Sequence, residues 1–170
     1  MLTGVYEYNH NHATAKVIHA NLSLVGAPKY TKNEEKFARD LQEAFGVDVE
    51  GYHAEVAELN LDPPRESGGS TDVANISWTT PTASFGVSNW PQNIPAHSWA
   101  STAASGSEPA LKAMLNACKV LAFNAIDVMS DPSLIEPMKN EFANSRKKFD
   151  YIPPVGPEVK PGLPSHMREK

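Results

Sequence analysis

Residues 104–131 read ASGSEPALKAMLNACKVLAFNAIDVMSD, and this stretch decides the fold class that the sequence predicts. Ser107 is a candidate N-cap, Pro109 is tolerated in the first turn, and apolar residues then recur every three or four positions. The resulting apolar face consists of Leu111, Met114, Leu115, Cys118, Leu121, Ala122 and Ala125. A stripe this regular predicts a long amphipathic helix whose apolar face packs in the core, with Cys118 as a small buried hydrophobe.

Residues 31–46 carry the clearest local signal of a second helix. Thr31 and Glu34 match the Ser/Thr-x-x-Glu capping box, and Gly46 suits a C-terminal cap. Apolar residues on one face of this helix are Phe37, Leu41, Ala44 and Phe45. The pattern predicts a capped helix that buries one side.

Two further helices are predicted on either side of these. A β-prone stretch, residues 3–8, leads into a helical pattern that Gly26 ends, with Val17, Ile18, Leu22 and Val25 at helical spacing. Asp131 caps another helix with Pro132 at its first position, and Pro137 either kinks it or marks its true start. The residues that this helix turns inward are Leu134, Ile135, Met138 and Phe142.

The remaining segments are punctuated by Gly and Pro. Residues 47–69 predict a surface loop with one short element, and residues 70–78 a capped turn or short helix. The β-rich run from Thr82 to Val87 predicts a buried strand. The last 20 residues hold five prolines and predict an extended tail. Helical and β-prone segments are thus mixed along the chain.

The composition is that of an ordinary soluble globular chain of 170 residues, 41% hydrophobic and 21% charged. Its net charge of -5 and the lack of a basic stripe exclude nucleic acid as an expected partner. Apolar stretches are interrupted well short of the roughly 20 residues that cross a bilayer, and the N-terminus lacks a signal pattern. We therefore expect a cytoplasmic protein without a membrane partner, and its single cysteine cannot form an internal disulfide.

Two residues are candidates for metal chemistry. His97 lies in PAHSW at 95–99, and Asp72 lies in a cap or turn 25 residues earlier. A carboxylate can orient a metal-bound imidazole, although the local sequence favours His97 as a histidine in a turn and Asp72 as a helix N-cap. His10 and His12 would point to the same side of a strand, but too few other ligands accompany them, which favours a solvated pair.

Four blocks of the sequence carry a resemblance to a known family. They are VGAPKYTKNEEKFARDLQ, STDVANISWTTP, PAHSWASTAASG and ALKAMLNACKVLAFNAIDVMSDPSLIEPMKNEF. In this order they resemble the C-terminal part of metal-dependent amidohydrolases related to aminobenzoyl-glutamate hydrolase, of the dinuclear-zinc aminoacylase and carboxypeptidase family. The resemblance implies an α/β fold in which helices pack on an incomplete sheet, as part of a zinc-exopeptidase-like catalytic domain over residues 31–150. The last strand and helix of a lid or dimerisation domain would precede it over residues 1–30, and the Pro-rich tail, 151–170, would follow.

The resemblance also assigns expectations to single residues. His97 matches the last zinc ligand of the family, Asp72 matches an acidic position that supports the site, and Asn11 matches the Asn of a Pro-Asn element. The chain departs from the family where Ala74 and Asn75 replace Gly-Asp, where Leu111 replaces a His, and where Asn9 and His10 replace Leu-Pro. Each departure removes a charge, a titratable group or a backbone preference near the family's site.

The family's other zinc ligands and its catalytic glutamate have no counterpart in this chain. One histidine cannot hold a dinuclear site, so we expect zinc to be absent or incompletely bound by the chain alone. The leading hypothesis is a fragment or remnant of an amidohydrolase for N-acyl amino acid or aminobenzoyl-glutamate amides, inactive by itself. The alternatives are a complementing subunit, whose partner is an N-terminal-half chain that completes the zinc site, and a non-catalytic interaction module. Self-association as a homo-oligomer is the other expected partnership.

Overall fold

The structure, a computed structural model, describes residues 4–62, 70–159 and 162. Part of the predicted loop at 47–69 and most of the end of the tail lie outside the described residues. The elements, in chain order, are α1 (His12–Val25), α2 (Lys32–Phe45), α3 (Val73–Ile76), α4 (Trp99–Ser105), α5 (Glu108–Ser130), the 3-10 turn η1 (Pro132–Leu134) and α6 (Ile135–Arg146).

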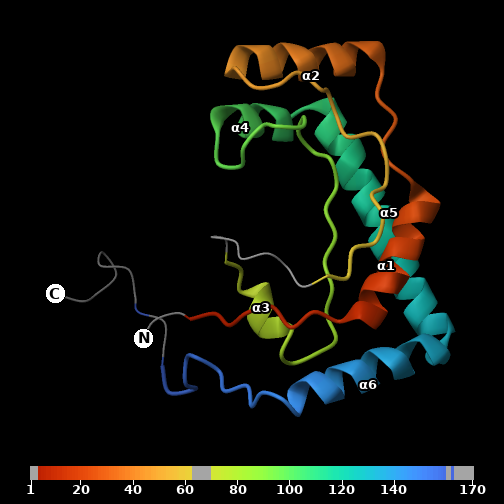
Figure 1. The fold of residues 1–170 in the computed structure, drawn as a ribbon, viewed down its shortest axis with the longest axis vertical. Helices are drawn as coiled ribbons and strands as arrows, with labels where there is room; N and C mark the ends of the chain where they lie inside the picture. The colour runs from red at the N-terminus through yellow and green to blue at the C-terminus, as the bar shows by residue number, and fades with distance from the viewer. Residues whose placement is uncertain (1–3, 63–69, 160–161, 163–170) are drawn as a thin grey trace.

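The helices are arranged in an open C (Figure 1). α2 and α4 lie together at one end, and α6 crosses the other end. α1 and α5 run side by side and form the back of the C, while extended chain at 79–98 connects α3 to α4 across its length. The helical predictions for 12–26, 31–46 and the long stretch after Ser107 are therefore confirmed as α1, α2 and α5.

The predicted α/β fold is wrong for the part of the chain that the structure describes. The described residues are 51% helical, and no strand or sheet occurs among them. Residues 82–87 are extended, but a strand needs a hydrogen-bonded neighbour, and this segment is tied only near its ends. The Asn11 N–H donates to the Thr82 carbonyl at 3.2 Å, and the Tyr30 hydroxyl donates to the Ser88 carbonyl at 2.9 Å.

The N-terminal stretch is also extended without becoming a strand. Two of its backbone N–H groups donate to side chains: that of Tyr6 to Asn75 Oδ1 at 3.2 Å, and that of Asn9 to Ser77 Oγ at 2.8 Å. The indole N–H of Trp78 donates a hydrogen bond to the Glu7 carbonyl at 2.7 Å. The β-prone N-terminal segment is thus extended because it is hydrogen-bonded to residues in and just after α3, and not because it pairs with a neighbouring strand.

α2 and α4 enclose the main hydrophobic cluster. The capping box of Thr31 and Glu34 is present, and Gly46 ends α2 in the left-handed conformation with φ 84°. Buried residues of the cluster are Leu41, Ile94, Ala100 and Ala104, with Phe37, Phe45, Val47 and Trp90 packed against them. Ala44, expected on the apolar face, is exposed. The cluster is small and lies at one end of the C.

Polar contacts hold the other end together. The Glu141 carboxylate of α6 accepts from the first two backbone N–H groups of α1, those of His12 at 2.9 Å and Ala13 at 2.8 Å. Asn11 is buried, caps α1 through Thr14 N, and donates to the Met138 carbonyl at 2.9 Å. These contacts satisfy donors that a helix N-terminus leaves free, so they fix the angle at which α1 meets α6.

The Asp131 cap is confirmed, since its side chain accepts from the Ser133 N–H at 2.9 Å. α6 then begins at Ile135, two residues before Pro137, so this proline lies in the first turn and does not break the helix. Met138 is buried as predicted, and Leu134, Ile135 and Phe142 are half-buried.

Candidate functional site

His97 lies in the turn just before α4, with its side chain exposed and its φ at 60°. The turn is set by the next residue, because Ser98 caps α4 and its Oγ accepts from the Ser101 N–H at 3.1 Å. α4 itself was not predicted, although a Ser at 98 followed three residues later by Ser101 was a usable capping signal. The position of His97 is therefore that of an exposed histidine in a turn.

Asp72 lies at the N-cap position of α3 and is exposed, and its carboxylate makes no capping hydrogen bond. α3 lies beside the N-terminal segment, whereas α4 lies with α2 at the other end of the extended chain (Figure 1). The structure therefore places Asp72 and His97 on separate parts of the molecule.

The described residues do not fit a zinc site. A catalytic zinc ion takes about three protein ligands and a structural one about four. No group of three or more His, Cys, Asp or Glu side chains able to hold a metal occurs in the described part of the chain. The described residues alone therefore support neither zinc binding nor a zinc-dependent reaction step.

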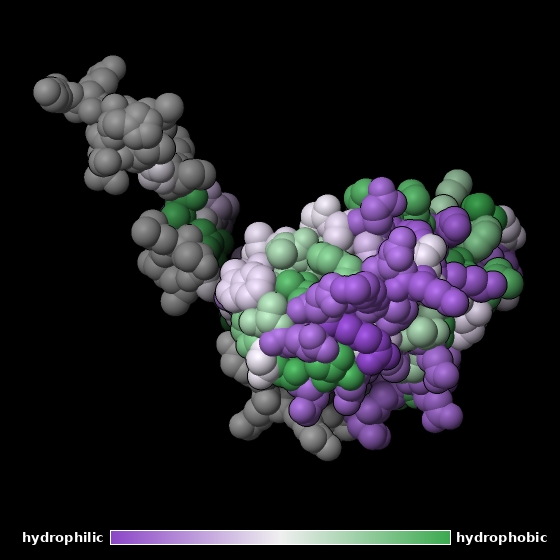
Figure 2. Space-filling view, turned by 90° about the horizontal axis from the view of Figure 1, so that it is seen from above, coloured by the Kyte–Doolittle hydropathy of each residue, from purple (hydrophilic) through white to green (hydrophobic). Residues whose placement is uncertain are grey.

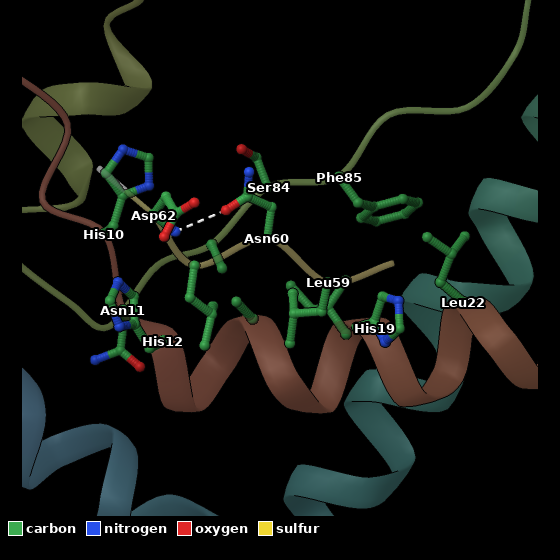
Figure 3. A pocket seen from close by; sticks show the side chains of 14 residues that line it. His10, Asn11, His12, His19, Leu22, Leu59, Asn60, Asp62, Ser84 and Phe85 are labelled. Atoms are coloured by element: carbon green, nitrogen blue, oxygen red, sulfur yellow. Dashed lines mark hydrogen bonds between the residues drawn. The ribbon is translucent and has the colours of Figure 1, made fainter. Parts of the chain in front are cut away.

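A large cleft opens along α1 (Figure 3). It has a volume of about 860 Å³ and is bounded by α1 and by the extended segments around residues 59–62 and 83–85. His10 and Asp62 lie toward one end, and Leu22 and Phe85 toward the other. The cleft is thus polar at one end and apolar at the other.

The three imidazoles of this cleft are spread along it (Figure 3). His10 precedes α1, His12 begins it, and a ring nitrogen of His19 lies 3.0 Å from the Ala57 carbonyl oxygen, one turn before Leu22. Burial lowers the pKa of His10, and the charge of nearby His12 lowers it further. The predicted His10 and His12 pair flanks the α1 N-terminus in place of sharing one face of a strand.

The most unusual surface of the molecule is on α5. We define the apolar face of α5 as nine exposed residues: Leu111, Met114, Leu115, Cys118, Leu121, Ala122, Ala125, Ile126 and Met129. Their exposed fractions reach 84% at Met129 and are 48% even at Leu111. The prediction that this face packs in the core, with Cys118 buried, is wrong within the described structure.

The opposite side of α5 is covered by α1, because it carries small and polar residues that pack against that helix or form hydrogen bonds with it. Ala113 and Val120 are fully buried there. Buried Asn21 of α1 donates to Asn124 Oδ1 at 2.8 Å and to Asp127 Oδ2 at 2.6 Å. These hydrogen bonds set the rotation of α5 about its axis and leave its large apolar residues facing away from α1.

The N-terminal half of α5 is held in the same rotation. Lys112 forms an ion pair with Glu34 at 2.7 Å, and the Asn116 side chain donates to the Gly26 carbonyl at 3.0 Å. Beside the apolar face a groove of about 350 Å³ is lined by Leu121 and by apolar residues of α1, α5 and α6. The apolar surface therefore continues beyond the helix itself.

By length and composition alone, α5 is the one helix in the described residues that is long and apolar enough to cross a membrane. No family model, no curated protein and no solved structure matches the chain.

Proposed function

We propose that this chain is a non-catalytic assembly module whose apolar face of α5 is covered by another polypeptide. The observation that carries the proposal is the exposure of nine apolar residues on a helix whose other side is already packed. Contiguous apolar surface of this extent on a soluble protein marks an interaction site. The ancestry that we propose, the C-terminal part of a metal-dependent amidohydrolase, is supported by the four sequence blocks in their order.

The energy available from this face is of the size that association requires. Burying what is still exposed of its six Leu, Met and Ile side chains contributes about 5–10 kcal/mol, at roughly 1.5–3 kcal/mol for each fully buried side chain. A partner surface of similar composition contributes about as much again. Lost rotational and translational freedom costs roughly 4–15 kcal/mol, so the apolar contact alone can offset it.

A polypeptide suits the apolar face better than a lipid bilayer does. A spanning helix exposes apolar residues all round, whereas α5 carries Asp127 and Lys112 on the side that packs against protein. Helices that lie on anionic membranes are rich in Lys and Arg, but the chain has a net charge of -5 and α5 carries only two such residues, Lys112 and Lys119. We also propose a cytoplasmic location, since the exposed Cys118 thiol suits a reducing compartment.

The experiment that tests this proposal places a photo-crosslinking amino acid at Ala122, in the middle of the apolar face, in cells that express the full chain. The matched control carries the same amino acid at Glu43, an exposed position of α2. We expect an adduct from position 122, with the partner identified by peptide mass spectrometry, and none from position 43. Equal or absent adducts at the two positions would contradict the proposal.

The identity of the linked peptide separates the candidate partners. One candidate partner is a separately encoded N-terminal-half chain of the amidohydrolase type. Its peptides would be distinct from those of this sequence. The purified chain, supplied with zinc and aminobenzoyl-glutamate, is expected to release no product. Hydrolysis above a heat-denatured control would overturn the non-catalytic part of the proposal.

A further inference from the structure

We infer that the polypeptide that covers the apolar face of α5 is a second copy of this chain, packed antiparallel across a two-fold axis. The inference rests on the proposed function and names its partner. It is carried by the area of the face and by the order of large and small residues along it.

The surface that two copies would bury is compatible with the minimum area of a specific dimer interface. The exposed parts of the six large side chains amount to roughly 200–400 Å² of apolar surface per copy, at about 25 cal/mol per Å². Because homodimer interfaces are about 65% apolar, two copies would bury roughly 600–1,300 Å² in total. This range includes the ~1,000 Å² that a specific interface should clear, so we expect a weak dimer, at the micromolar end of the range that larger interfaces span.

Large and small residues on the apolar face of α5 follow a similar order when the helix is read in either direction. A two-fold axis beside residue 120 brings Leu111 level with the partner's Met129 and Cys118 level with the partner's Ala122. At 100° per residue these four positions lie within about 30° of the middle of the face, so they meet directly. Small residues at the centre let the helix axes approach to about 8–10 Å, and large residues close both ends.

The charges of α5 favour the same arrangement. Its apolar face contains no charged residue, so two copies meet there without desolvating an ion, while exposed Lys119 beside the face stays at the solvated rim. Antiparallel packing sets the positive end of one helix dipole beside the negative end of the other, whereas parallel packing sets like ends together. The antiparallel register is therefore the one that the sequence of α5 supports.

Disulfide cross-linking between two single-cysteine proteins tests the register directly. One protein is the full wild-type chain, with Cys118, and the other carries C118S and A122C. In the proposed register Cys118 faces the partner's position 122 across the interface. Identical positions are offset by about 6 Å along the axis, which puts their Cα atoms roughly 7–8 Å apart, at or just beyond the ~7 Å limit of a disulfide.

We expect covalent dimer in the oxidised mixture and little in either protein alone. A C118S chain with Glu43→Cys is the matched control, because it presents an equally exposed thiol on α2 and should not cross-link to the wild type. Circular dichroism of each variant checks that its helix content is unchanged.

Three outcomes would overturn the inference. Equal cross-linking in each protein alone would indicate parallel or unspecific contact. A mixture that stays uncross-linked, with a monomeric mass in sedimentation, would exclude self-association. Photo-adducts from position 122 that contain only a different polypeptide would leave the proposed function standing while removing the second copy as its partner.

Discussion

α2 and α5 are both amphipathic helices, but only α2 has its apolar side covered by this chain. Leu41 and Ala38 of α2 are buried against α4 and its preceding loop, and its outer side is charged. Figure 2, seen from the α2 side, shows hydrophilic side chains gathered in a broad band across this face of the molecule. On α5 the large apolar residues are outside, and the covered side is held by Ala113, Val120 and polar contacts. Helical periodicity therefore identifies an apolar face without identifying what covers it.

The largest expected difference between the two helices is in their response to the same truncation. Leu41→Ala removes a buried side chain and should lower the free energy of unfolding by about 2–5 kcal/mol. Leu115→Ala, on the exposed face of α5, should change it by less than about 0.5 kcal/mol. Urea denaturation at sub-micromolar protein, where a dimer is dissociated, measures both values. Equal losses would mean that the face of α5 is packed inside this chain, which would break the comparison.

A smaller effect is expected at the contact that sets the rotation of α5. Asn21→Ala leaves half-buried Asp127 without its 2.6 Å hydrogen bond and should cost about 1–3 kcal/mol, because a partly desolvated carboxylate loses its donor. Ser23→Ala, at an exposed position of the same helix, is the matched control and should be nearly neutral. Thermal unfolding followed by circular dichroism compares the two. If both variants melt alike, polar pairing does not set the orientation of α5.

The smallest expected effect links the two helices and depends on pH. The hydrogen bond from Lys112 of α5, together with the Thr31 cap, lowers the pKa of Glu34 below its usual value of 4.5. A carboxyl whose pKa is lower in the folded state stabilises the fold above its unfolded pKa, and that stabilisation is lost as pH falls through the folded pKa. The wild type should therefore lose stability as pH falls below about 4.5.

Lys112→Met should reduce the part of this acid sensitivity that belongs to Glu34, and Lys119→Met should not. Both lysines are on α5, but only Lys112 is paired with Glu34. Midpoints of urea unfolding at pH 3, 5 and 7 give the comparison. An identical pH profile for the two variants would show that the ion pair does not couple α2 to α5.

Much of the local structure could be predicted from the sequence, because it depends on neighbouring residues. The capping box of Thr31 and Glu34, the left-handed Gly46 and the Asp131 cap are all confirmed. Each uses contacts between residues two to four positions apart, which a single sequence displays.

The long-range structure could not be predicted in the same way. The run from Thr82 to Val87 has the composition of a strand, but a strand also needs a neighbour, and none occurs for it in the described residues. The face of α5 reads as core because Leu, Met and Cys are usually buried, whereas Asn21 and Asp127 orient it outward. His97 and Asp72 are placed apart for a similar reason, since spacing in sequence does not give distance in space.

The reactivity of the Cys118 thiol tests the central claim most directly, because Cys118 lies in the middle of the apolar face and is the only cysteine of the chain. Its rate of modification by a disulfide reagent should be fast in dilute protein and should fall at least about tenfold as the concentration rises through the expected micromolar range. The C118S chain with Glu43→Cys should react at one rate throughout. A Cys118 rate that is slow at every dilution would mean that the chain buries this face itself, and a rate that is fast at every concentration would mean that nothing in the sample covers it. Either result would contradict the account.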